Sequence, residues 1–229
     1  MTVFTSLVPV DVSSQGPSVP RRISDSTVRR LSHYIRALEE LECSGSTTVS
    51  SDELARGGGT TAAQVRKDLS QFGSFGKRGL GYNVADLGAR LRTILGLERR
   101  WRVVLVGAGR IGSALFAYPN FTRRGYDCVA VLDSDPAKVG TRWGSVLIRG
   151  AEDLEEVVRE READLVIVAV PAEAAQRVAE RAVAAGAKGI LNFAAVALRV
   201  PHHVPVTNVN LVMELEALSF AVTQVGKGA

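Results

Sequence analysis

Three glycines and one aspartate form the clearest chemical pattern in the sequence. Gly107, Gly109 and Gly112 directly follow the apolar run Val103–Val106, and Asp133 ends the next apolar run, 21 residues after Gly112. Gly107 permits a tight turn, Gly109 lacks a side chain that would keep a phosphate off the backbone, and Gly112 lets the next helix pack closely. The pattern predicts a site for the pyrophosphate of a dinucleotide.

The predicted nucleotide is NAD⁺ or NADH rather than the 2′-phosphorylated form. Asp133 would accept hydrogen bonds from the ribose hydroxyls and repel a 2′-phosphate, and no arginine follows it immediately. Backbone N–H groups at the start of the helix attract the phosphate charge. The predicted phosphate loop comprises Gly107, Ala108, Gly109, Arg110, Ile111 and Gly112.

A second candidate site lies in the first half of the chain, on a predicted helix from Ala62 to Phe72. Val65, Leu69 and Phe72 form an apolar stripe on this helix, which Thr60 or Thr61 can cap. The remaining surface carries amide and basic groups, which can bond base edges in a major groove or DNA phosphates. These candidate DNA contacts are Gln64, Arg66, Lys67 and Gln71.

The elements before this helix follow the order of a helix-turn-helix. Ser24–Glu42 is predicted to be a helix that Ser24 or Ser26 caps. Its apolar positions are Val28, Leu31, Ile35, Leu38 and Leu41. Ser50 and Glu53 have capping-box spacing, and the run Gly57–Gly59 ends this short second helix.

A glycine-rich stretch follows the candidate DNA-reading helix. Phe72–Tyr82 alternates glycine with aromatic and basic residues, which predicts a β-hairpin with Lys77 and Arg78 at its tip. Such a basic tip can reach a minor groove. Asn83–Leu97 is again helical in period, so the first part of the chain is predicted to be a winged helix-turn-helix domain.

From Trp101 onward, short apolar runs alternate with helical stretches. They are Val103–Val106, Val129–Leu132, Leu165–Val170 and Gly189–Leu191. Strands that alternate with helices predict an α/β fold with a Rossmann-like, doubly wound parallel sheet. The chain is therefore predicted to combine a DNA-reading domain with a dinucleotide-binding domain.

Composition excludes several classes of protein. No apolar run approaches the roughly 20 residues that a membrane span needs, and the first 20 residues lack the pattern of a signal peptide. The two cysteines cannot form a four-thiolate zinc site, and Cys128 lies in an apolar strand. We therefore expect a cytoplasmic protein without metal or membrane partners. The net charge of +4 lies entirely in residues 1–100, where it is consistent with DNA binding.

Two alternatives are open at this stage, a small NAD-dependent oxidoreductase and a CoA- or nucleotide-binding module, each with a helical appendage. An oxidoreductase usually takes its acid or base from a second large domain, but only residues 193–229 follow the last predicted strand. His202 and His203 lie there beside a proline and are expected to be solvated loop residues. A CoA-binding module would have little use for Lys77 and Arg78. We therefore predict that the chain is not an enzyme.

Read as a whole, the sequence resembles the Rex family of redox-sensing repressors over roughly residues 20–225. Residues 64–82 match the family's recognition helix and wing almost residue for residue, and residues 107–119 and 186–194 agree as well. The resemblance implies a homodimer with a domain-swapped C-terminal helix, which binds palindromic operators when NADH is scarce and leaves DNA when NADH binds. NADH and NAD⁺ are the implied cofactors.

The resemblance also adds residues to both sites. The added cofactor-binding residues are Tyr118, Val170, Pro171, Asn192 and Phe193, and the added DNA-binding residues are Thr61, Ser70, Gly79 and Tyr82. Tyr118 matches a family tyrosine that reports the nicotinamide redox state, and Arg36 matches an arginine that couples it to the DNA-binding domain.

This sequence departs from the family pattern at two places. The family's aspartate at the start of the swapped helix is replaced by Asn210, which can accept a hydrogen bond but cannot form a salt bridge with Arg36. The proline expected after Asn-Phe-Ala is replaced by Ala195. The first departure affects the predicted coupling set of Arg36, Tyr118 and Asn210. The second is expected to loosen the loop near the nicotinamide pocket, which Phe193 still lines.

The predicted organisation has four parts. Residues 1–20 form a disordered tail, 21–98 the winged-helix domain, 99–207 the Rossmann domain and 208–229 the dimerisation helix. In the last part, Leu211, Leu215, Leu218 and Val222 form an apolar stripe. Closure of the sensor domains around NADH would alter the spacing of two recognition helices, and a dimer fits its operator only at the matching spacing.

Overall fold

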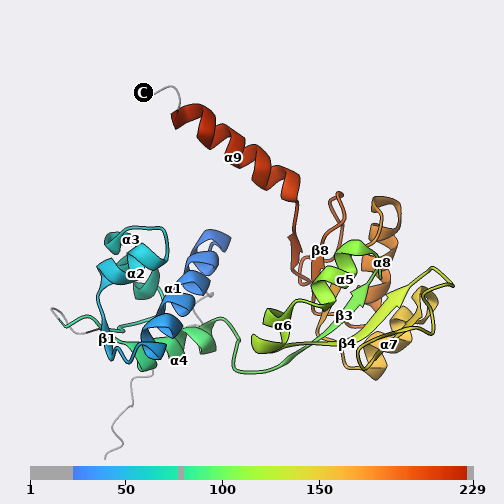
Figure 1. The fold of residues 1–229 in the computed structure, drawn as a ribbon, viewed down its shortest axis with the longest axis horizontal. Coiled ribbons are helices and arrows are strands. Elements are labelled where there is room, and N and C mark those ends of the chain that lie inside the picture. Colours follow the sequence, from blue (N-terminus) through green and yellow to red (C-terminus); the bar gives the residue numbers. More distant parts are fainter. Residues whose placement is uncertain (1–22, 77–79, 226–229) are drawn as a thin grey trace, which may run out of the picture. The chain divides into compact units, whose positions relative to one another are not determined.

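A computed structural model describes residues 23–76 and 80–225, and the chain divides after Leu95 into two compact units (Figure 1). The division falls slightly before the junction expected at residue 98. The tail predicted for residues 1–20 lies outside the described residues, and so do Lys77, Arg78 and Gly79 at the predicted wing tip.

The first unit contains four helices and a two-stranded sheet within its described residues. In chain order these are α1 (Asp25–Cys43), β1 (Thr48–Val49), α2 (Ser51–Gly57), α3 (Ala62–Ser70), β2 (Tyr82–Asn83) and α4 (Val84–Ile94). Side chains cap each helix start: Ser24 for α1, Ser50 with Glu53 in a full capping box for α2, Thr61 for α3 and Asn83 for α4. The helix-turn-helix order predicted from the sequence is confirmed.

Each of the four helices buries apolar side chains. Leu31, Ile35 and Leu38 of α1 are buried as predicted, but Val28 is 39% exposed. Tyr34 is fully buried instead. The prediction for Val28 was wrong because the buried stripe of α1 runs through Thr27, Leu31 and Tyr34, which turns Val28 toward solvent.

The predicted β-hairpin over Phe72–Tyr82 is also wrong for the described residues. Gly73–Gly76 forms no strand, and β2 pairs antiparallel with β1, so that Tyr82 lies opposite Val49. Glycine pays a high entropic cost in a strand and provides no side chain for cross-strand packing. Gly73 has φ +120°, which a regular strand does not use.

A buried carboxylate connects α3 to α1. Asp68 has no exposed surface, and it accepts two hydrogen bonds from Arg30, at 2.6 and 2.8 Å. The hydroxyl of Tyr34 donates at 3.0 Å and the amide of Gln64 at 2.8 Å. Burial opposes ionisation of Asp68, but these donors outweigh it and hold the pKa of the carboxyl below its ordinary value. The network fixes the candidate DNA-reading helix on α1.

The second unit is a seven-stranded sheet with helices on both faces. Its strands are β3 (Trp101–Val106), β4 (Tyr126–Asp133), β5 (Arg142–Trp143), β6 (Val146–Gly150), β7 (Leu165–Val168), β8 (Gly189–Asn192) and β9 (Val206–Asn208). The order is β5-β6-β4-β3-β7-β8-β9, and every pairing is parallel except that of β5 with β6. The predicted doubly wound sheet is confirmed, whereas β5, β6 and β9 were not foreseen.

The helices of this unit are α5 (Arg110–Phe116), α6 (Pro119–Arg123), α7 (Leu154–Glu160, after the 3-10 turn Ala151–Asp153), α8 (Ala172–Ala184) and α9 (Leu211–Val225). Buried residues of α7 and α8 pack on one face of the sheet, through side chains such as Val104 and Val166. Side chains of α5 and α6 pack on the other face, around Leu105 and Ile167. An apolar pocket of 330 Å³ lies on this second face. It is lined by Val103, Phe121, Tyr126, Leu165, Ile167, Gly189, Ile190, Leu191, Pro205 and Thr207.

Helix α9 is left without a covering surface in the single chain (Figure 1). Every side chain from Leu211 to Gln224 is exposed, including Leu211 at 70% and Phe220 at 67%. Single exposed apolar residues are ordinary, but a whole apolar helix marks an interaction surface. Within residues 23–76 and 80–225, no helix is long and apolar enough to cross a membrane.

The Asp68 network predicts an acid-sensitive contribution to stability. In the folded protein the pKa of the Asp68 carboxyl lies below its ordinary value of 3.8. The stabilisation is therefore fully present above pH 3.8 and is lost as the pH falls through the folded pKa. We expect the free energy of unfolding of the wild type to fall more steeply below about pH 4 than that of Asp68→Asn. At pH 7 the variant should lose about 3 kcal/mol, because Arg30 loses its buried partner. Urea unfolding between pH 3 and 7 measures both effects, and parallel pH profiles would contradict the assignment.

Candidate functional site

The glycine loop after β3 has the conformation that the sequence predicted. Gly107 has φ +107°, and its N–H donates to the carbonyl of Leu132 at 2.7 Å. A Cβ at Gly107 would overlap the carbonyl of Ala169, and one at Gly112 would overlap the carbonyl of Gly107. A Cβ at Gly109, in contrast, would meet no atom within 4 Å. Two glycines therefore serve close packing, and the third leaves backbone open to a ligand.

Asp133 stands at the carboxyl end of β4, beside this loop. Its carboxylate accepts the N–H of Ala108 at 2.6 Å and the N–H of Asp135 at 2.8 Å. Burial opposes ionisation, but these two backbone donors and Lys138 lower the pKa of Asp133. A carboxylate has about four acceptor positions, and these three donors take three of them, which leaves one for the ribose hydroxyls.

Lys138 is a residue of this site that sequence reasoning missed. Its Nζ lies 3.3 Å from Asp133 and 3.6 Å from Asp135. The sequence search considered only an arginine directly after Asp133, whereas the turn Ser134–Ala137 brings a lysine back to the carboxylate. Lys138 thus reduces the negative charge that a ribose would meet.

The other predicted cofactor residues gather near the same edge of the sheet. Val170 and Pro171 follow β7, and Pro171 starts α8. Phe193 follows β8, donates its N–H to Val168 at 2.8 Å and packs on the sheet face that α5 covers. Tyr118 directly precedes α6, is 48% exposed and packs edge-on against Phe121.

Asn192 differs from the other predicted cofactor residues, because its side chain is fully used within the protein. It has no exposed surface. Its amide donates to the carbonyl of Val196 and to Oδ1 of Asn208, both at 2.8 Å, and accepts the N–H of Ala194 at 2.9 Å. The side chain therefore orders the loop that follows Phe193.

The predicted coupling residues lie in different units. Arg36 is exposed on α1 of the first unit. Asn210 precedes α9 in the second unit, and its Oδ1 accepts the N–H groups of Val212 and Met213 at 3.0 and 3.4 Å. Asn210 thus acts as a helix cap, a role that its amide oxygen fills without charge.

Cys128 does not have the environment of a redox-reactive thiol. It is half-buried, and burial raises the pKa of its thiol to about 11. A reactive cysteine needs a lowered pKa. No group of three His, Cys, Asp or Glu that could hold a metal ion occurs among the residues that the structure describes.

The candidate DNA-reading helix presents a basic surface. Arg66, Lys67 and Ser70 of α3 are exposed, and so is Gln71 at its end. Gln64 is half-buried, with its amide on Asp68, and Thr61 caps the helix by accepting the N–H of Gln64. The structure thus groups Arg66, Lys67, Ser70 and Gln71 on the exposed surface. Gln64 instead bonds to the buried Asp68, and Thr61 caps the start of the helix.

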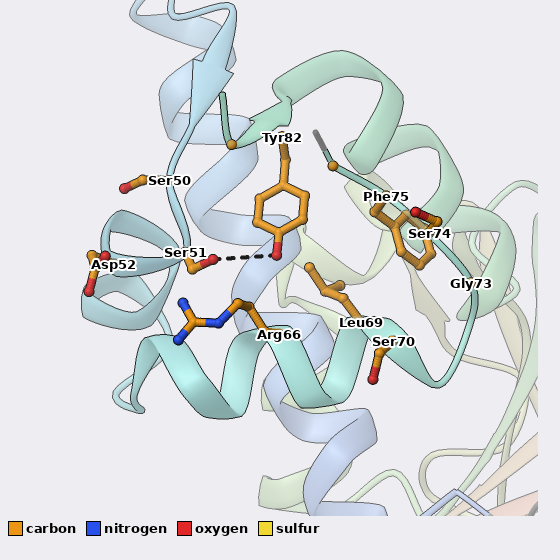
Figure 2. A pocket seen from close by; sticks show the side chains of 12 residues that line it. Ser50, Ser51, Asp52, Arg66, Leu69, Ser70, Gly73, Ser74, Phe75 and Tyr82 are labelled. Atoms are coloured by element: carbon orange, nitrogen blue, oxygen red, sulfur yellow. Dashed lines mark hydrogen bonds between the residues drawn. The ribbon is translucent and has the colours of Figure 1, made fainter. Parts of the chain in front are cut away.

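A groove of 580 Å³ runs beside α3 (Figure 2). It is lined by Ser50, Ser51, Asp52, Arg66, Leu69, Ser70, Gly73, Ser74, Phe75, Gly76, Gly81 and Tyr82. Arg66 points from α3 toward Ser51, whose hydroxyl lies 3.4 Å from that of Tyr82. Tyr82 lines this groove and is only 9% exposed, a burial that the sequence pattern did not indicate.

The two units define a class of protein, a helix-turn-helix DNA-binding unit joined to a nucleotide-binding Rossmann unit. Comparison with family models agrees with this division. Residues 22–70 match the family described as "Putative DNA-binding protein N-terminus", and residues 98–196 match the family described as "CoA binding domain".

Relatives of known identity match nearly the whole chain. The redox-sensing transcriptional repressor Rex of Carboxydothermus hydrogenoformans is 51% identical over 87% of this chain and 96% of its own length. Rex of Desulforamulus reducens is 47% identical over 87% of this chain and 95% of its own. The chain therefore belongs to the Rex family of redox-sensing transcriptional repressors, whose members are repressors and not enzymes.

Solved structures agree with this assignment. One of them is RSP, described as a Rex-family repressor, in complex with β-NAD⁺ and operator DNA. Its sequence is 36% identical to this chain, the TM-score is 0.84, and the match covers 89% of this chain and 94% of that one. RSP in complex with β-NADH is 34% identical, with a TM-score of 0.81 over 90% and 96% of the two chains.

The glycine loop yields a matched pair of variants. Gly112→Ala should lower the free energy of unfolding by about 2–3 kcal/mol, because backbone must move to admit the methyl group. Gly109→Ala should leave stability within about 0.5 kcal/mol but weaken NADH binding at least tenfold, because its methyl group occupies the open space beside the loop. Urea unfolding and a fluorescence titration with NADH measure the two effects. A Gly109→Ala variant that binds NADH normally would remove this loop from the site.

Proposed function

We propose that this chain acts as a homodimer that binds a palindromic operator through two copies of α3 and releases it when NADH fills the cleft at Gly107–Gly112. The observation that carries the proposal is that one chain combines the basic surface of Arg66, Lys67 and Ser70 with a dinucleotide loop that is open at Gly109. We place this activity in the cytoplasm, where DNA and the NADH pool meet.

On the DNA side, Arg66, Lys67, Ser70 and Gln71 contact the operator directly. Arg66 suits a guanine edge, and Lys67 suits a phosphate. Gln64 and Thr61 hold the start of α3, and Tyr82 shapes the groove beside it. Lys77, Arg78 and Gly79, which lie outside the described residues, provide the minor-groove contact predicted from the sequence.

On the cofactor side, the loop 107–112 holds the pyrophosphate through its backbone N–H groups, and Arg110 adds a positive charge. Asp133 accepts the ribose hydroxyls. Phe193 and Tyr118 present aromatic surface to the nicotinamide, with Val170 and Pro171 nearby. NADH carries an uncharged nicotinamide and NAD⁺ a cationic one. Aromatic surface replaces water at a smaller cost for the uncharged ring, which favours NADH.

The dimer is proposed to form through α9. Its two apolar sides, with Leu211, Leu215 and Leu218 on one and Met213 and Phe220 on the other, are all exposed in the single chain. A partner that exchanges this helix would cover both sides and would find apolar surface such as the 330 Å³ pocket on the sheet. Arg36 and Tyr118 complete the proposed coupling, with Asn210 as a weaker third member than an aspartate.

Operator release by NADH is the central test. NADH titrated into the complex of this protein with a palindromic operator should release the DNA, whereas NAD⁺ at equal concentration should not. Fluorescence anisotropy of a labelled operator measures this release. Arg66→Ala should weaken operator binding about 5- to 150-fold and leave NADH affinity unchanged. Equal effects of NADH and NAD⁺ on the wild type would contradict the proposal, as would release by CoA alone.

The dimer has its own test. Leu218→Glu should give a monomer and reduce operator affinity, because each half-site is then bound separately. Ser219→Glu adds the same charge on the polar side of α9 and should remain dimeric. Sedimentation velocity measures the assembly state of both variants. A dimeric Leu218→Glu protein would place the interface elsewhere.

A further inference from the structure

Two neighbouring strands of the sheet both end in asparagine. β8 and β9 are parallel, and Asn192 is directly paired with Asn208 in their register. Parallel strands present their carboxyl ends at the same edge of the sheet, so the two side chains can meet there. They do so, since the Nδ2 of Asn192 donates to the Oδ1 of Asn208 at 2.8 Å.

Asn192 has no free N–H group with which to compensate for a lost acceptor. Both N–H groups of its amide donate and its oxygen accepts, although the side chain has no exposed surface. Its own carbonyl also accepts the N–H of Val209 at 2.8 Å. Leaving a buried amide without a partner is costly, so the groups bonded to Asn192 tend to move together with it.

The groups bonded to Asn192 come from two segments with different roles. Ala194 and Val196 belong to the loop that directly follows Phe193, which is proposed to face the nicotinamide. The far end of that loop is held by Gln176 of α8, which makes two hydrogen bonds of 2.9 Å to the backbone of Arg199. Asn208 belongs to the segment that leads through Asn210 into α9. Asn192 is therefore bonded on one side to the loop after Phe193 and on the other to the segment before α9.

We propose that the amide pair Asn192–Asn208 transmits occupancy of the nicotinamide cleft to α9. Both act here as positioning residues, through the loop after Phe193 and the segment before α9. The inference rests on the proposed function, because it specifies how that function couples its two sites. A shift of the Phe193 loop moves Asn192, and through Asn208 it displaces the last residues before α9. The pair thus provides a coupling route that does not need an acid at position 210.

Asn208 is the residue to change, because it is exposed and the three remaining bonds of Asn192 then stay in place. In Asn208→Ala, NADH affinity and operator affinity without cofactor should each stay within threefold of wild type. The factor by which saturating NADH weakens operator binding should fall about fivefold, the size that one hydrogen bond supports. Asn208→Asp keeps a side-chain oxygen that can accept the hydrogen bond of Asn192, and its charge is exposed to solvent at this position. This variant should therefore restore the factor. Titrations of each cofactor and operator, separately and together, measure all of these quantities.

Gln176→Ala is the matched control. It loosens the same loop at its other end and leaves the contact between β8 and β9 intact, so the coupling factor should stay at the wild-type value. An unchanged coupling factor in Asn208→Ala would overturn the inference, and so would an equal loss in Gln176→Ala or a failure of Asn208→Asp to restore it. If the wild type itself shows no response to NADH, the proposed function fails instead, which separates the two outcomes.

Discussion

The sensor unit depends on one constraint, which is that parallel strands deliver their carboxyl ends to one edge of the sheet. Gly107 follows β3, Asp133 ends β4, Asn192 ends β8 and Asn208 ends β9. Residues that are up to 101 positions apart in the sequence therefore lie at the same edge of the sheet. The close packing of Gly112 on Gly107 then fixes the start of α5 against β3 and leaves backbone exposed at Gly109.

The DNA-binding unit is subject to a different constraint. The short helix α3 must be held in a fixed orientation while its polar face stays exposed. Asp68 holds α3 from the buried side through Arg30, Tyr34 and Gln64. Because those donors satisfy the carboxylate, Arg66 and Lys67 are not drawn inward to neutralise it. The buried ion pair therefore specifies orientation more than it adds stability, which is a role that buried polar networks have in several proteins.

The helix caps at Ser24, Ser50 and Thr61 and the glycine loop were predictable, because each depends on residues close together in sequence. The β-hairpin over Phe72–Tyr82 was mispredicted for its described residues because alternating glycine and aromatic residues resemble a hairpin, whereas the partner of Tyr82 is Val49, 33 residues away. The Asp68 network was missed for the same reason, since Arg30 and Tyr34 lie 38 and 34 residues away. Lys138 was missed although Asp133 is only five residues away, because only an arginine directly after the carboxylate was considered. A carboxylate beside the apolar stripe of Val65 and Leu69, and asparagines at two strand ends, were signals that could have been used.

The use of amides at the proposed coupling point has a physical consequence. DNA binding depends steeply on salt, because counterions are released when basic groups meet phosphates. A salt bridge between an arginine of one unit and an acid beside α9 would be screened under the same conditions. The Asn192–Asn208 bond is uncharged and keeps its strength across that range. Asn210 is likewise an uncharged amide at the position where the family has an aspartate. The proposed coupling between the nicotinamide and α9 then depends on the positions of these amides and not on a salt bridge, so salt changes operator affinity and leaves the coupling unchanged.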